Sequence, residues 1–170
     1  MISLYRKMAC VDRLAGKYKI RNYNLVFHQY YVALFFMHFA EKEHIEYDVK
    51  VIDFILKHDI YEVLTNDLPW ECKNLNDITK ECWKQIEKEV GNCYKGLELY
   101  SDEQLKKCLN LKQYLLFKAM DYLELFIFIK EEKMLGNSNT ELMKIADRCI
   151  ELIKGKFKSV DEFLYKENCK

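Results

Sequence analysis

Four ionisable side chains lie within or beside strongly apolar stretches of this sequence. His28 opens a run of apolar and aromatic residues, His58 and Asp59 follow the segment "VIDFIL", and Asp121 lies within "YLLFKAMDYLELFIFI". A buried ionised carboxylate without a partner costs several kcal/mol, so such groups need a shared counter-ion. Imidazole and carboxylate together suit Mn, Fe, Co, Ni or Zn and leave coordination positions for water. The residue types therefore predict a site for one divalent cation.

Glu62 extends this pattern. It follows His58 by four residues and Asp59 by three, which places it on the same face of a helix. A carboxylate there can orient a cation-bound water or accept its proton. Plainer interpretations stay open on the residues alone. A His-Asp dipeptide is a weak signal, and Asp121 could form an ordinary ion pair with Lys118 one turn earlier.

Helices must position these side chains. One proline and five glycines leave few breaks, and strand-like alternation of apolar and polar residues is scarce. We therefore predict an all-α fold, formed by a single domain over residues 1–170. The expected helices span about residues 3–17, 24–44, 47–57, 58–64, 77–94, 101–134 and 139–157, with a last short helix from residue 159. Their expected caps are Asn24, Asp77, Ser101 and either Ser138 or Asn139.

Composition excludes several classes of function. The 27 basic residues balance 27 acidic ones, so no global charge favours a nucleic-acid polymer or an anionic membrane as partner. The seven cysteines form no CxxC pair of the kind that structural zinc sites use. No apolar run approaches the ~20 residues of a membrane span, and the first residues do not read as a signal peptide. We expect a cytoplasmic protein.

The order of the candidate residues resembles that of the HD-domain metal-dependent phosphohydrolases. "HDIYEVLTNDLP" is similar to the "HDxxEvltGDlP" signature of the YfbR-like 5′-deoxynucleotidases, and "RNYNLVFHQYYVA" to that family's Arg-x-x-Asn-x-x-x-His opening. "KAMDYLELFIFIKEEKMLGN" resembles the family helix that carries its last metal ligand. The resemblance covers about residues 13–153 and implies a compact HD-domain helical bundle.

The resemblance also implies roles for individual residues. Glu62 would be the catalytic carboxylate, and Asp67 would face the sugar or the leaving group of the substrate. One divalent ion, drawn from Mn, Co, Fe, Ni, Zn or Mg, would be the cofactor. Its implied ligands are His28, His58, Asp59 and Asp121.

The sequence departs from the family pattern in three places. Asn66 replaces a glycine of the signature, although Asn tolerates a positive φ better than other residues do. Phe27 replaces the glutamate that usually precedes the first histidine. We expect the family's phosphate-binding Arg-Trp-Pro segment to be shortened here. The substrate would then be contacted by Lys17, Tyr18, Lys19, Arg21, Asn24 and, by stacking on the base or packing on the loop, Trp70.

These observations predict a metal-dependent phosphohydrolase that acts on nucleotides. The most specific expectation is a 5′-nucleotidase that releases phosphate from deoxynucleoside 5′-monophosphates. One alternative is a dNTP triphosphohydrolase, which would cleave dATP to deoxyadenosine and triphosphate, as some small phage HD proteins do. A second alternative is a non-catalytic HD module that senses a nucleotide or binds a protein. The resemblance also implies a homodimer.

Overall fold

The computed structural model describes residues 2–73, 75–93 and 106–168. Within these ranges the regular structure is helical, which confirms the all-α prediction, and the only strand-like pairing is an isolated bridge between Asp12 and Asn24. None of the described helices has the length and apolarity needed to cross a bilayer. The elements are α1 (Ile2–Lys7), the 3-10 helix η1 (Met8–Cys10), α2 (Leu25–Lys42), α3 (Val49–Ile55), α4 (Glu62–Thr65), α5 (Trp70–Lys73), α6 (Asp77–Cys93), α8 (Leu111–Met134), α9 (Thr140–Ile153) and α10 (Lys158–Asn168).

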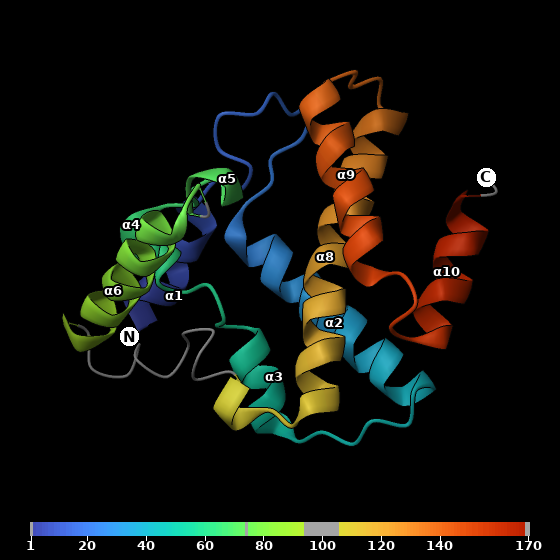
Figure 1. Cartoon of the computed structure of the whole chain (residues 1–170), viewed down its shortest axis with the longest axis horizontal. Helices are drawn as coiled ribbons and strands as arrows, with labels where there is room; N and C mark the ends of the chain where they lie inside the picture. The colour runs from blue at the N-terminus through green and yellow to red at the C-terminus, as the bar shows by residue number, and fades with distance from the viewer. Residues whose placement is uncertain (1, 74, 94–105, 169–170) are drawn as a thin grey trace.

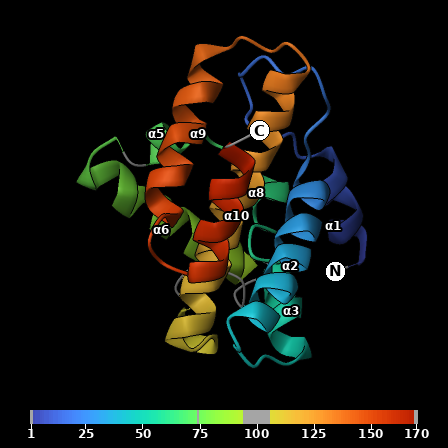
Figure 2. The same cartoon turned by 90° about the vertical axis from the view of Figure 1, so that its right-hand side faces the viewer.

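Helix α8 is the centre of the bundle. It packs along α2 on one side and α9 on the other (Figures 1 and 2), and α10 closes against α2. Because α8 has neighbours on both sides, its sequence is apolar around much of its circumference. Its fully buried side chains include Leu116, Phe117, Met120, Leu123 and Ile129. A polar residue at such a position is therefore enclosed by protein rather than by water.

Side-chain caps set the start of the helices that carry the site. Asn24 accepts a hydrogen bond from the backbone of Phe27, and Asn139 accepts one from the backbone of Glu141, as the sequence predicts. The start of α2 at Leu25 is thereby fixed three residues before His28.

Two predicted caps have a different outcome. The cap before α6 is Asn76, not Asp77, because the Asn76 side chain accepts from the backbone of Thr79 at 2.9 Å. Ser101 lies outside the described residues. Within the described residues of this stretch, α8 begins at Leu111, where Asn110 and Gln113 form a capping box.

The predicted helix over residues 3–17 is wrong beyond residue 10. The chain leaves the helix after Cys10, and both Leu14 (φ 56°) and Gly16 (φ 80°) adopt backbone conformations that no α-helix contains. Arg13 instead donates its backbone N–H to the Tyr23 carbonyl at 2.8 Å. This turn brings residue 13 next to the start of α2, and hence next to the site.

Asn66 ends α4 with φ 60° and ψ 168°. The positive φ expected at the position of the signature glycine is therefore present. This conformation is essentially confined to glycine, and other residues lose about 1–3 kcal/mol there.

We expect Asn66→Gly to raise the free energy of unfolding by about 1 kcal/mol, because relief of strain exceeds the added entropy of the unfolded chain. Urea denaturation measures the change. The matched control is Asn22→Gly, an exposed position without a positive φ, which should lower stability. A less stable Asn66→Gly protein would contradict the strain.

Candidate metal centre and substrate pocket

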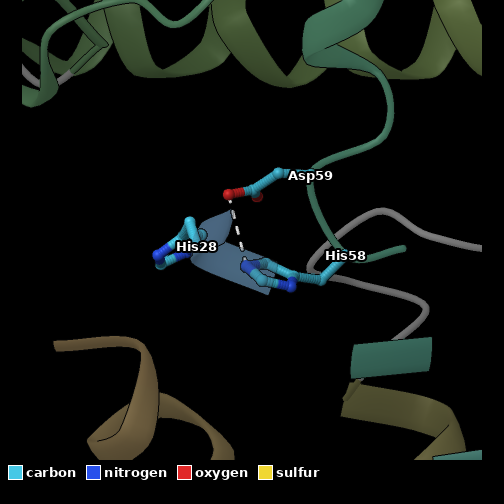
Figure 3. Close-up of side chains that lie close together, drawn as sticks. All are labelled: His28, His58 and Asp59. Carbon is cyan, nitrogen blue, oxygen red and sulfur yellow. Dashed lines mark ion pairs between the residues drawn. The ribbon is translucent and has the colours of Figure 1, made fainter. Parts of the chain in front are cut away.

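Four candidate ligands converge from separate elements. His28 comes from α2, His58 and Asp59 from the turn between α3 and α4, and Asp121 from α8. Figure 3 shows the first three facing one another, and each offers a ligand atom within 4.8 Å of the others. Asp59 Oδ2 lies 3.2 Å from His58 Nε2, and Asp121 Oδ1 lies 3.1 Å from His28 Nε2. Such short separations suit donors arranged around one cation.

The two histidine rings show that these residues fit a metal ion. Nε2 of His28 and Nε2 of His58 are both buried and make no hydrogen bond, although carboxylate oxygens lie close by. At His58 the tautomer is set by the other ring nitrogen, since Nδ1 donates to the Ile55 carbonyl at 2.7 Å. The lone pair is then on Nε2 and faces the cluster. A cation supplies the partner that these buried nitrogens lack.

The two aspartates are held in their ionised form. Burial acts to raise the pKa of the Asp59 carboxyl, but the neighbouring His58 and Arg13 hold it well below its usual range. Burial likewise opposes ionisation of Asp121, yet the close approach of His28 and the charge of Lys118 lower its pKa. Lys118 Nζ lies 3.6 Å from Asp121, so the ordinary ion pair considered above exists beside the cluster. Both carboxylates can therefore bind a cation without first losing a proton.

A buried amide fixes the His-Asp dipeptide against α2. The Gln29 side chain, in the orientation that satisfies its neighbours, donates to the Leu56 carbonyl at 2.8 Å and accepts from the Asp59 backbone at 3.1 Å. Gln29 follows His28 directly in the sequence. The same turn of α2 therefore supplies one candidate ligand and holds the backbone of another.

Glu62 lies at the start of α4, with only 2% of its surface exposed. Burial, followed by the charge of Asp59, raises its pKa to about 8, even though Arg13 and Lys73 act in the opposite direction. Lys73 Nζ lies 3.1 Å and Arg13 Nη1 3.5 Å from its carboxylate oxygens. A carboxyl group with this pKa can both donate and accept a proton near neutral pH.

A cavity of about 310 Å³ opens over these groups. Acidic side chains form one part of its wall, namely Asp59, Glu62, Asp67 and Asp121. Cationic side chains form a second part, namely Arg13, Lys17, Lys73, Lys118 and Arg148. A third part is largely apolar and comes from α8 and α9, with Tyr122, Leu125, Ile145 and Leu152. The cavity can thus hold an anionic group near the cluster and a flat apolar group beside it.

Most of the basic residues expected to contact substrate lie away from this cavity. Lys17 lines it, and its ammonium pairs with Glu141 at 2.6 Å. Tyr18 is 70% exposed, and Lys19 pairs with Asp12. Neither lines the cavity.

The remaining expected contacts have other positions. Arg21 pairs with Glu131 and Glu132 on α8 and lines a different cavity. Asn24 is the cap of α2 and does not line the substrate cavity. The side chain of Trp70 lies outside the part of the chain that the structure describes.

Arg13 is a site residue that the sequence interpretation missed. Its guanidinium is largely buried and donates to Asp59 Oδ2 at 3.0 Å. The helical pattern expected over residues 3–17 includes this residue. That pattern does not indicate the turn that redirects the chain after Cys10. Asp67 stabilises that turn by accepting the backbone N–H of Leu14 at 2.8 Å. The positive φ of Leu14, two residues before Gly16, is a local feature that the helical pattern of the sequence does not reveal.

Glu124 and Tyr23 are two more missed residues. Glu124 Oε2 lies 2.6 Å from His28 Nδ1, and the Tyr23 hydroxyl donates to the same carboxylate. An acidic residue one turn after Asp121 in an apolar helix was the available signal.

Comparisons with known proteins identify the family and the fold of this chain. The family model described as 5′-deoxynucleotidase YfbR-like matches residues 1–167. No curated protein matches the chain.

Several solved structures share the fold. A cyanophage S-2L HD phosphohydrolase (DatZ), bound to dA and one catalytic Zn²⁺, has a TM-score of 0.71 at 17% identity, covering 91% of this chain and 82% of its own. An HD-domain phosphohydrolase from Listeria innocua has a TM-score of 0.69 at 17% identity, with coverage of 88% and 76%. A conserved hypothetical protein from Pyrococcus furiosus has a TM-score of 0.66 at 24% identity, with coverage of 97% and 93%.

The family match spans nearly the whole chain, and the fold is that of HD-domain phosphohydrolases. The protein therefore belongs to the YfbR-like 5′-deoxynucleotidase family, whose description is that of a nucleotide phosphohydrolase.

Proposed function

We propose that this protein is a 5′-nucleotidase that hydrolyses deoxynucleoside 5′-monophosphates to a deoxynucleoside and phosphate. The observation that carries the proposal is the pair of buried, unpartnered Nε2 atoms of His28 and His58 beside two ionised aspartates at the wall of the cavity. The family description and the deoxyadenosine held by the cyanophage protein support a deoxynucleotide substrate.

In this proposal His28, His58, Asp59 and Asp121 hold one divalent cation. A bound cation of this kind polarises a phosphate oxygen and lowers the pKa of water. The cyanophage relative contains Zn²⁺, and the mixed imidazole and carboxylate donors also suit Mn, Fe, Co and Ni.

Glu62 moves the proton in the proposed reaction. Its carboxyl group lies beside the ligand cluster and has a pKa of about 8 because of burial. It can accept a proton from the attacking water and deliver a proton to the departing 5′ oxygen. Asp67 acts through the backbone of Leu14, which keeps the Arg13 turn over the cavity.

Arg13 binds the phosphate in this proposal, in place of the residues between 17 and 21 that the sequence favoured. Its guanidinium, now paired with Asp59 and close to Glu62, presents a fork of donors that matches phosphate geometry. The family resemblance implies a phosphate-binding arginine in the segment before the first histidine, and Arg13 belongs to that segment. Lys73 and Lys118 flank the same region as point charges.

A triphosphate substrate is a second candidate, because five cationic side chains line the cavity and a monophosphate carries only two charges. Intact triphosphate would then be the product. A purely sensing module is the weaker alternative, since the histidines, the aspartates and Glu62 are all in place.

The test is product analysis with dNMP, NMP and dNTP panels in Mn²⁺, Co²⁺, Zn²⁺ and Mg²⁺. We expect free phosphate from dNMPs, and a kcat/KM about 100-fold lower for Arg13→Lys, because lysine cannot make the bidentate contact. Arg6→Lys, at an exposed position on α1, is the matched control and should match the wild type. Intact triphosphate from dNTPs, with no phosphate from dNMPs, would overturn the monophosphate proposal.

Glu62 also makes stability depend on pH. Its pKa of about 8 lies above the ordinary value of 4.5, so the folded protein binds more protons than the unfolded chain between these pH values. Stability from this group is therefore lost as pH rises through that window. Glu62→Gln, which stays neutral, should stabilise the metal-free protein at pH 8 by on the order of 4 kcal/mol and leave stability at pH 4 unchanged.

Chemical denaturation in the presence of a chelator at the two pH values measures this difference. Glu151→Gln on the exposed side of α9 is the control and should give no pH-dependent difference from the wild type. Equal stabilisation by Glu62→Gln at pH 4 and pH 8 would show that the buried charge is not the cause.

We further propose a homodimer formed through α2. Its residues Phe27, Tyr30, Tyr31 and Leu34 have helical spacing and are 37–53% exposed, which gives one apolar face. Light scattering should give a molar mass of about twice the 20.6 kDa of the chain, and Tyr31→Asp should halve it. A monomeric wild-type protein, or a Tyr31→Asp protein that stays dimeric, would contradict this interface.

A further inference from the structure

Glu124 is an enclosed acidic residue at the centre of α8. It is 5% exposed and follows Asp121 by three residues, so the two carboxylates lie one helical turn apart on the same side of the helix. A carboxylate at such a depth is costly unless its oxygens have partners. The partners of Glu124 therefore indicate why the position is acidic.

These partners are the first histidine and a buried tyrosine. Glu124 Oε2 lies 2.6 Å from His28 Nδ1 and also accepts a hydrogen bond from the Tyr23 hydroxyl. Tyr23 is itself immobilised, because its ring stacks on Phe128 with centroids 3.9 Å apart. The Glu124 carboxylate is thus held at Nδ1 of His28, the ring nitrogen on the far side from the candidate metal site. With Nδ1 engaged in this way, His28 presents Nε2 toward Asp121.

His28 and His58 are oriented by different kinds of acceptor. The acceptor for His58 Nδ1 is the backbone carbonyl of Ile55, whereas His28 depends on a side chain. A carboxylate acceptor increases the basicity of the ring nitrogen that faces the metal. Only the orientation of His28 can therefore be altered by a single substitution of its acceptor.

We propose that Glu124 positions His28 for the divalent cation and that Tyr23 holds Glu124 in place. Glu124 is a positioning residue, because it does not line the substrate cavity and acts only through the ring of His28. This inference rests on the proposed role of His28 as a metal ligand. A merely structural role would make its variants less stable and leave the affinity for metal unchanged.

The test is the dissociation constant for Zn²⁺ and for Co²⁺, measured by competition with a chromogenic chelator at fixed pH. We expect Glu124→Gln to bind metal about 10-fold and Glu124→Leu about 100-fold more weakly than the wild type, the range seen when such acceptors are removed. Tyr23→Phe should weaken binding less than either, because it leaves the carboxylate present.

Glu132→Gln is the matched control. Glu132 is a fully buried carboxylate on the same helix, but its partners are the backbone of residues 20 and 21 and the side chains of Arg21 and Asn137. It should lose stability without a change in metal affinity. The visible spectrum of the Co²⁺ protein gives a second readout, which should change for the Glu124 variants and not for Glu132→Gln.

The outcomes distinguish failure of the positioning role from failure of the proposed ligand set. Folded Glu124 variants with wild-type affinity and an unaltered Co²⁺ spectrum would overturn the positioning role and leave the proposed function intact. A wild-type protein that binds neither metal would overturn the ligand set and the positioning role together. If Glu124→Leu does not fold, the isosteric Glu124→Gln decides the question.

Discussion

In the proposed metal centre, two imidazoles and two carboxylates are held close together while largely removed from water, and the proposed function depends on that constraint. Each group alone would be costly at its depth, since Asp59 and Asp121 are ionised and Nε2 of His28 and Nε2 of His58 make no hydrogen bond. The groups become compatible when they share a positive charge. The bundle supplies the required precision, because α2 and α8 are packed along much of their length and each carries one ligand.

The supporting contacts give each ligand one orientation. His58 is held by a backbone carbonyl, His28 by Glu124, and the Asp59 backbone by the amide of Gln29. None of these supports lies on the exposed surface. The supporting contacts therefore lie on the side of the cluster that faces the core of the bundle. The other side of the cluster faces the cavity, which Arg13 and Glu62 line.

The sequence indicated the candidate metal centre more readily than the residues that line the cavity, for a physical reason. His28, His58, Asp59 and Asp121 stand out because polar residues interrupt apolar helical patterns, which are local signals. Arg13 depends on a turn stabilised by Asp67 from more than fifty residues away, and a helical pattern does not reveal such a contact. Glu124 was visible as an acid in an apolar helix, but its role required knowing that α8 faces Tyr23 and His28. The candidates between residues 17 and 21 included basic residues close to His28 in the sequence. Lys19 pairs with Asp12, however, and Arg21 pairs with Glu131 and Glu132, so neither side chain lines the cavity.

Anomalous diffraction from a crystal soaked in Mn²⁺ or Co²⁺ tests the central claim most directly. The account predicts one anomalous peak per chain, about 2.0–2.2 Å from Nε2 of His28, Nε2 of His58 and one carboxylate oxygen each of Asp59 and Asp121. A peak that leaves His28 or Asp121 outside coordinating distance, or no peak in this cluster at all, would contradict it.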